Sequence, residues 1–157
     1  MRKLIKGTVA LAASMGMLSV APASAANVEF DATVTGTCTL EVTDEGSLAV
    51  SADFKTLSSK GVADGQGGVK AVATDDGFTL SVTPAATGWK KEPAGNTVAT
   101  DFATEVLLTG ATVRDGPRST PQTLKRGTTD AAIDLTATNE NPFMAGDYTG
   151  EVVVTCD

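Results

Sequence analysis

The sequence predicts an all-β sandwich of about seven to nine strands. The first observation is a strict alternation between residues 28 and 43, where even positions are apolar or glycine and odd positions are charged or threonine. Successive side chains of a strand point to opposite faces, so this pattern gives one apolar face and one polar face. The second observation is that similar short runs, separated by Gly, Pro, Asp and Asn, recur to the end of the chain. No segment shows helical periodicity with caps, which leaves two packed sheets as the expected architecture.

The first 25 residues have the form of a secretory signal peptide. Arg2, Lys3 and Lys6 precede an apolar run, and Ala23-Ser24-Ala25 supplies a small-x-small cleavage site. The alternative is an amino-terminal membrane anchor, but the run is too short to span a bilayer. We therefore expect export through the periplasm to a secreted or cell-surface location, with no membrane insertion after cleavage. The expected divisions are a signal peptide at 1–25, an amino-terminal extension or donor strand at 26–36, and the sandwich domain at 37–157.

The charge of the processed chain argues against two classes of partner. Removing residues 1–25 takes away three cations and no acids, so the formal charge moves from −7 to −10. Binding to nucleic acid or to anionic lipid depends on Lys and Arg that neutralise phosphates. Neither partner is therefore expected.

Two cysteines, Cys38 and Cys156, nearly enclose the expected domain. Their even number in an exported chain predicts a disulfide, and both lie on the apolar parity of their strands. Two buried free thiols are the alternative. A metal pair is disfavoured because the chain has no histidine to complete a site.

The strands after the first are predicted from the same alternation. They are expected at residues 48–52, 69–73, 78–82, 106–113, 133–137 and 148–156. Between two of them, Asp75-Asp76-Gly77 is a hairpin signal.

Three loops stand out by composition. Residues 87–91 hold Trp89, which would either stack on a sugar or anchor a partner, or else cover the end of the sandwich. Residues 114–126 carry four cations, which would either dock on an acidic neighbour or lie solvated. Residues 139–143 have turn chemistry, with Phe143 folded back as a plug.

The sequence offers little for catalysis, and we expect no enzyme and no cofactor. Without histidine, a Ser-His or Cys-His nucleophile pair cannot form. The acid pairs Asp44-Glu45 and Asp75-Asp76 each precede a glycine, where such residues are favoured for turn geometry alone. No run has the oxygen-ligand spacing of an EF-hand, so no metal site is expected.

The carboxyl end resembles the last strand of bacterial pilin subunits of the chaperone-usher type. It is also similar to the related spore-coat-protein-U-like secreted domains. The resemblance rests on an Ala-Gly-x-Tyr-x-Gly turn followed by alternating valines. In this chain the matching residues are Ala145, Gly146, Tyr148, Gly150, Val152 and Val154. The resemblance implies an Ig-like sandwich that lacks its last strand, within a structural subunit of a fimbria or coat that serves cell adhesion.

The resemblance also implies donor-strand complementation, in which the extension of one subunit fills the groove of the next. Val28, Phe30, Ala32 and Val34 would be the groove-filling side chains, and Gly36 would mark the bend before the domain. The implied partners are further copies or related subunits, together with a periplasmic chaperone and usher. Two features depart from the pilin pattern: the second cysteine is the penultimate residue, and the terminal aromatic is replaced by Thr155-Cys156-Asp157.

The alternative is a closed monomeric sandwich in which residues 28–34 form its own first strand. Such a protein would be an exported binding module for carbohydrate or protein. It would use the loops around Trp89 or at residues 114–126.

Overall fold

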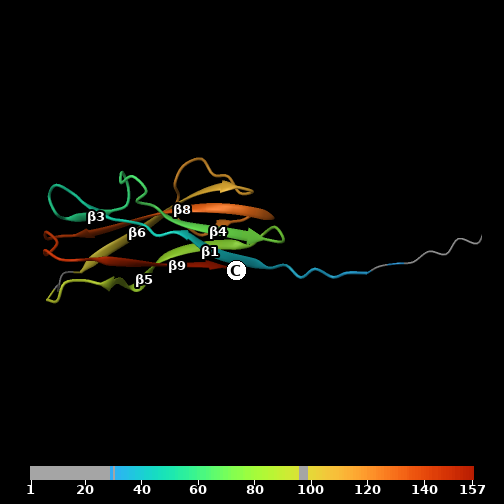
Figure 1. Ribbon diagram of the computed structural model, residues 1–157, viewed down its shortest axis with the longest axis horizontal. Coiled ribbons are helices and arrows are strands. Elements are labelled where there is room, and N and C mark those ends of the chain that lie inside the picture. The colour runs from blue at the N-terminus through green and yellow to red at the C-terminus, as the bar shows by residue number, and fades with distance from the viewer. Residues whose placement is uncertain (1–28, 30, 96–98) are drawn as a thin grey trace, which may run out of the picture. The chain divides into compact units, whose positions relative to one another are not determined.

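Two antiparallel sheets make up the described part of the chain in the computed structural model (Figure 1). The structure describes residue 29, residues 31–95 and residues 99–157. The first sheet contains β1 (Cys38–Asp44), β2 (Ala49–Val50), β3 (Thr56–Ser58), β4 (Gly67–Ala73), β6 (Thr100–Gly110) and β8 (Gly127–Asn139). The second contains β5 (Thr79–Lys91), β7 (Gln122–Thr123) and β9 (Thr149–Cys156). The predicted all-β fold is confirmed.

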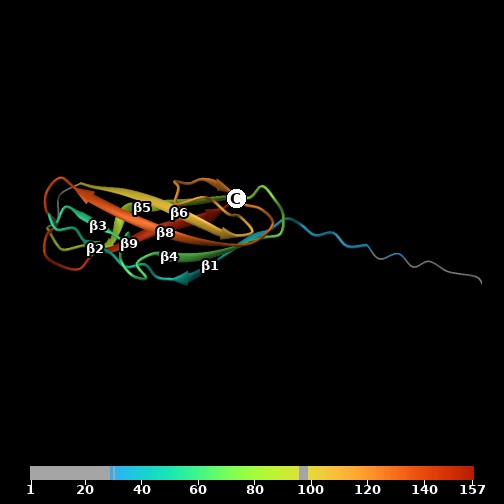
Figure 2. The same cartoon turned by 90° about the horizontal axis from the view of Figure 1, so that it is seen from above.

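Strand β8 is the centre of the first sheet. It pairs with β6 on one side and with β4 and then β3 on the other. Ile133, Leu135 and Ala137 on β8 are buried, as their alternation predicts, because they face the second sheet. Strand β1 pairs with β4, and β2 pairs with β3, so β1 and β2 form one margin of the sheet (Figure 2), while β6 forms the other.

Strand β5 is longer than the sequence pattern indicates. Residues 87–91 are expected as a loop, but β5 continues to Lys91 because β9 pairs with it through Gly150 and Thr149. The register is irregular between Pro84 and Trp89. Proline has no N–H to donate to a ladder, and such irregularities let a strand continue past it.

The hairpin predicted at Asp75-Asp76-Gly77 is wrong. Strands β4 and β5 on either side of it belong to different sheets. Gly77 has a φ of 98°, and its N–H donates to the carbonyl of Leu124. The segment is a tight turn that carries the chain from one sheet to the other.

The strand order is that of an Ig-like sandwich without its seventh strand. Immunoglobulin domains place strands A, B, E and D in one sheet and C, F and G in the other. Here β1, β4, β8 and β6 occupy the first four places, and β5 and β9 take those of C and F. Tyr148, just before β9, donates its hydroxyl to the carbonyl of Met144, 3.1 Å away. This matches the tyrosine corner that precedes strand F in such domains.

The core has two parts. The larger cluster lies between the sheets and includes Leu80, Val82, Val106, Leu108, Leu124 and Ile133. The smaller one surrounds Trp89, which is 8% exposed and packs edge-on against Phe102 and Phe143. Phe143 therefore does fold back as a plug, at the end of the sandwich opposite the disulfide. We call this the far end.

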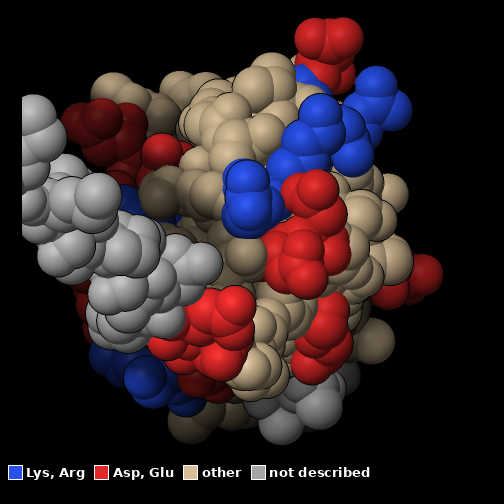
Figure 3. Space-filling view, turned by 90° about the vertical axis from the view of Figure 1, so that its right-hand side faces the viewer, with Lys and Arg blue, Asp and Glu red and all other residues tan. Residues whose placement is uncertain are grey.

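The other end is where β1 begins and β9 finishes, and we call it the disulfide end. Cys38 pairs with Ala73, and Ala73 pairs with Gly127 at the start of β8. Seen from this side, Lys and Arg side chains gather together, with Asp and Glu side chains beside them (Figure 3).

Residues 34–157 form one compact unit. The described residues before it, 29 and 31–33, lie outside any strand. In the part of the chain that the structure describes, no helix has the length and apolar character needed to cross a membrane.

Candidate functional site

Strands β1 and β9 lie at the margin of the first and the second sheet, respectively. Each pairs with a neighbouring strand on one side only. β1 is the last strand of the first sheet, next to β4, and β9 is the last strand of the second, next to β5. Among the described residues, no strand pairs with the outer side of either. We call this margin, with the core-facing side chains Leu40, Val42, Val152 and Val154, the open edge.

The core-facing side of β1 is uncovered. Leu40 and Val42 lie opposite Ala71 and Val69 in the β1–β4 ladder, so all four point to the same face. Ala71 and Val69 are buried, whereas Leu40 is 37% exposed and Val42 is 72% exposed. Two apolar side chains thus face the core side of the sandwich without being covered by the second sheet.

The core-facing side of β9 is partly covered. Val154 lies opposite the buried Val82, and Val152 lies opposite Pro84. Both valines pack against the main core cluster and remain half-buried. The open edge therefore presents apolar side chains from both strands.

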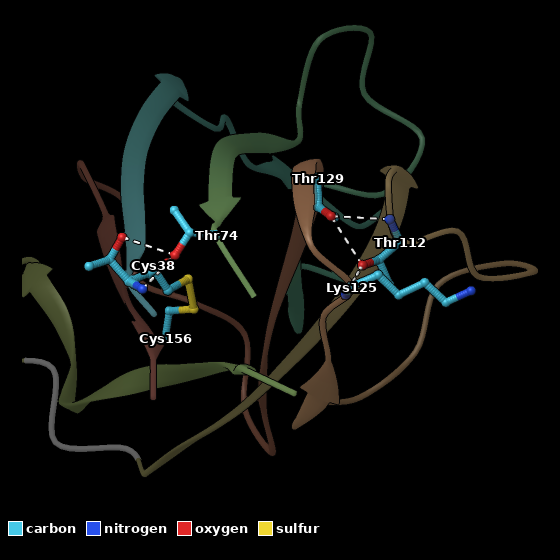
Figure 4. Close-up of a disulfide and its surroundings, with 7 residues drawn as sticks. Cys38, Thr74, Thr112, Lys125, Thr129 and Cys156 are labelled. Atoms are coloured by element: carbon cyan, nitrogen blue, oxygen red, sulfur yellow. Dashed lines mark hydrogen bonds between the residues drawn. A yellow bond between two sulfur atoms is a disulfide. The ribbon is translucent and has the colours of Figure 1, made fainter. Parts of the chain in front are cut away.

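The predicted disulfide between Cys38 and Cys156 is confirmed, and it joins the two strands of the open edge (Figure 4). The two Cα atoms are 6.1 Å apart. A strand placed between two neighbours needs about 4.8 Å on each side. The disulfide therefore holds β1 and β9, which belong to different sheets, closer together than one such strand spacing on each side would allow.

The chain before β1 continues in line with that strand. The Thr37 N–H donates to Thr74 Oγ1 at 2.7 Å, and the Thr74 N–H donates to the Thr37 carbonyl at 2.9 Å. Before it, Gly36 lies beside Asp75 and Phe78. A return of this segment along its own β1 would need a reversal of the chain, and residues 36 and 37 show none.

Two of the four predicted donor residues, Ala32 and Val34, lie in the part of the chain that the structure describes. Val34 is 81% exposed, and Ala32 is exposed. Val28 and Phe30 lie outside the described residues. Neither Ala32 nor Val34 is in a strand.

The residues of the final-strand motif have structural roles. Gly146 has a φ of 149°, and a Cβ there would come within 2.6 Å of the Pro93 ring. Gly150 backs onto Leu135 and Trp89. Tyr148 packs on Trp89 with ring centroids 5.0 Å apart. Burial raises the pKa of Tyr148 above its ordinary value of 10.0.

Of the two alternatives for Trp89, the structure shows the one in which it covers the end of the sandwich, not the one in which it is exposed for stacking. Its indole Nε1 donates to Thr100 Oγ1 at 3.3 Å. The ring lies inside the aromatic cluster, and its face is taken up by neighbouring rings.

A hollow of about 1050 Å³ lies on the side of the first sheet that faces away from the core. Its most notable residue is Asp134, which is 5% exposed and which the sequence analysis did not single out. The carboxylate accepts from Ser59 Oγ and from Gln66 Nε2, each at 2.8 Å. Both oxygens are engaged, so Asp134 anchors the 59–66 loop to β8. Asp134 lies between Ile133 and Leu135, so the alternation of the strand predicts that its side chain faces away from the core. No local pattern in the sequence predicts that a loop distant along the chain buries it.

The described residues contain no group of three or more His, Cys, Asp or Glu arranged to hold a metal ion. The acid pairs Asp44-Glu45 and Asp75-Asp76 are exposed and lie at turns or strand ends.

No family model and no curated protein matches the chain. The class of protein that the fold defines is an Ig-like sandwich with an open edge, and the interpretation of that edge rests on its geometry.

Proposed function

We propose that the chain is an exported structural subunit of a bacterial surface fibre or coat, and that copies assemble by strand exchange. Residues 28–34 of one copy add to the open edge of another and supply the seventh strand. The observation that carries the proposal is the exposure of Val42, an apolar side chain that faces the core side of the sandwich and lies uncovered.

The donor segment has the pattern that the open edge requires. A strand that joins β9 presents alternate side chains to the core, and the even residues Val28, Phe30, Ala32 and Val34 supply four apolar ones. Their burial contributes on the order of several kcal/mol, before any backbone hydrogen bonds to the strand edge. An uncovered sheet edge beside apolar side chains promotes aggregation, so a partner strand also protects the protein.

The exit direction of the segment favours exchange over self-pairing. Thr37 is held on Thr74, and the chain continues past the disulfide end. A second copy can accept the segment without a reversal. A periplasmic chaperone that covers the open edge before assembly, and an usher, are the corresponding partners.

The test uses adjacent residues of opposite parity in the extension. The chain lacking residues 1–25 is refolded at high concentration and run on detergent gels with and without boiling. We expect ladders that survive detergent and collapse on heating. Val34→Asp should abolish them because it places a charge against the apolar edge. Thr33→Asp carries the same added charge on the opposite face and should leave them intact.

A matched pair on the acceptor side completes the test. Val42→Asp should abolish the ladders, whereas Thr43→Asp should not, and both native side chains are exposed, so neither change should unfold the domain. A single monomer band in every lane of the unmodified chain would refute strand exchange.

A further inference from the structure

The two margins of the first sheet differ in how their outer edges are covered. Beside β6, residues 114–118 lie along the outer edge. Arg118 and Val106 exchange backbone hydrogen bonds of 2.8 and 2.9 Å, and the Arg114 N–H donates to the Leu108 carbonyl at 3.2 Å. On the opposite margin, no strand among the described residues pairs with the outer side of β1 or β2. Stable proteins usually protect such edges, so the uncovered margin calls for an explanation.

Strands β1 and β2 follow one another along this margin. The ladders through β4 and β3 place both strands against β8, which serves as a common ruler. Asp44, at the end of β1, is level with Ala132 of β8, and Val50 in β2 is level with Ala137. β2 therefore continues the line of β1 towards the far end (Figure 2).

Val50 repeats on β2 the situation of Val42 on β1. It lies opposite Leu57, which is buried in the aromatic cluster of the far end, so both side chains point to the core face. Val50 is nevertheless 49% exposed. Leu48 is half-buried against the same cluster. The core-facing apolar side chains of the margin thus run from Leu40 and Val42 to Leu48 and Val50.

The distance between the two exposed valines matches the length of the donor segment. Val42 is level with Ala131 and Val50 with Ala137, six residues apart on β8, which is about 20 Å along a strand. The apolar residues of the segment 28–34 span the same six residues. Because the disulfide holds its two Cα atoms 6.1 Å apart, a strand that contacts both β1 and β9 has to lie towards the far end.

The turn after Val50 holds this part of the margin in place. The Ser51 N–H donates to the Thr56 carbonyl at 2.8 Å, and the Thr56 N–H donates to Ser51 Oγ at 2.9 Å. The Lys55 carbonyl accepts from the Asn139 N–H at 2.9 Å, which ties the hairpin to the end of β8. Val50 therefore lies on a fixed backbone, and a partner that packs on it does not have to order the hairpin first.

We propose that the acceptor site continues from β1 onto β2, and that one end of the donated strand packs on Val50. This inference rests on the proposed function, because the occupant is residues 28–34 of a second copy. The donated strand then covers Val42 near one end and Val50 near the other. A donor shorter by two residues would leave one of these valines uncovered, so the site selects for the length of its donor.

A charge placed on either face of β2 tests the contact. For the chain lacking residues 1–25, the measured quantity is the protein concentration at which half of the chain runs in ladders. Val50→Asp should raise this concentration by about tenfold or more, because the carboxylate would be buried against the donated strand. Ala49→Asp adds the same charge at an exposed neighbour that faces away from the core, and should leave the concentration unchanged.

A truncation tests the same contact without a charge. Val50→Ala should raise the concentration for half assembly by about tenfold through the loss of two methyl groups from the contact. Val72→Ala is the matched control, since Val72 is 38% exposed and lies on β4 between the buried Ala71 and Ala73, facing away from the core. Urea denaturation followed by Trp89 fluorescence shows that each unassembled variant is folded.

Double variants locate the contact on the donor. Val50→Ala is combined with Val28→Ala and, separately, with Val34→Ala. For the end that packs on Val50, the double variant should lose less than the product of the two single fold-changes, because the contact is removed only once.

Two results would overturn the inference and leave strand exchange in place. One is a concentration for half assembly that is the same for Val50→Asp and Ala49→Asp. The other is a set of fold-changes that simply multiply in both double variants. If the unmodified chain forms no ladders, the proposed function falls, and this inference falls with it.

Discussion

Gly146 shows how a single residue fixes the corner before the last strand. Its φ of 149° lies in a region that side-chain-bearing residues rarely adopt, and the Pro93 ring occupies the place of a Cβ. The corner it forms sets Tyr148 against Trp89. The glycine-tyrosine-glycine pattern at this end is therefore a packing requirement of the β8–β9 connection.

We expect Gly146→Ala to lower the free energy of unfolding by about 1–3 kcal/mol, because the new methyl group strains the backbone and meets Pro93. Urea denaturation followed by Trp89 fluorescence measures it. Gly67→Ala is the matched control, since the nearest atom to its Cβ is 3.8 Å away and its φ is ordinary. Its stability should be unchanged or slightly higher. Equal losses for the two variants would contradict the role given to Gly146.

Tyr148 should titrate above pH 10. Burial favours the neutral phenol and raises its pKa in the folded state. Because the folded pKa exceeds the unfolded one, this group's contribution to stability is complete below the unfolded pKa and is lost as pH rises through the folded pKa. The chain has one tyrosine, so phenolate absorbance reports it directly. A midpoint identical in native and urea-unfolded protein would disprove the shift.

At the scale of elements, alternation predicted which face each strand turns to the core but not whether that face is covered. Residues 133–137 behave as predicted because β8 is central and has neighbours on both sides. Val42 has the same pattern and is exposed, because β1 is a margin strand that the second sheet does not cover. The extension of β5 through Trp89 was missed because Pro84 and Gly88 are turn residues, while the pairing with β9 that overrides them is distant in sequence.

The open edge itself was anticipated only through the resemblance of the carboxyl end. The parity and even count of the cysteines correctly predicted the disulfide. The acceptor residues Leu40 and Val42 were not singled out, because nothing local distinguishes a margin strand from a central one.

The disulfide stabilises the margin formed by β1 and β9. We expect Cys38→Ser/Cys156→Ser to lower the free energy of unfolding by about 2–5 kcal/mol, since the bond closes a loop with a sequence separation of 118. Hydrogen exchange should accelerate most in β1, which has one neighbouring strand, while β8 stays protected. Unchanged exchange in β1 would show that its pairing with β4 suffices without the bond.

At the scale of the whole molecule, the fold is a six-strand arrangement of the Ig order with short additions. β2, β3 and β7 extend the margins, and the aromatic cluster seals the far end. The main core leaves Leu40 and Val42 on β1 exposed, whereas Val152 and Val154 on β9 pack against it. The closed part holds the domain together, and in the proposed fibre the open edge is where a neighbouring copy would bind.

The link between Cys38 and Cys156 determines how a fibre built from this chain would carry tension. A pull on the extension reaches the domain at Thr37, one residue before Cys38. The load can then cross the disulfide into β9 and pass to the strand donated by the neighbour. This path avoids the other strands, so the covalent loop that encloses the sandwich is not stretched. A fibre of such subunits would yield by sliding of the donated strand before any domain unravels.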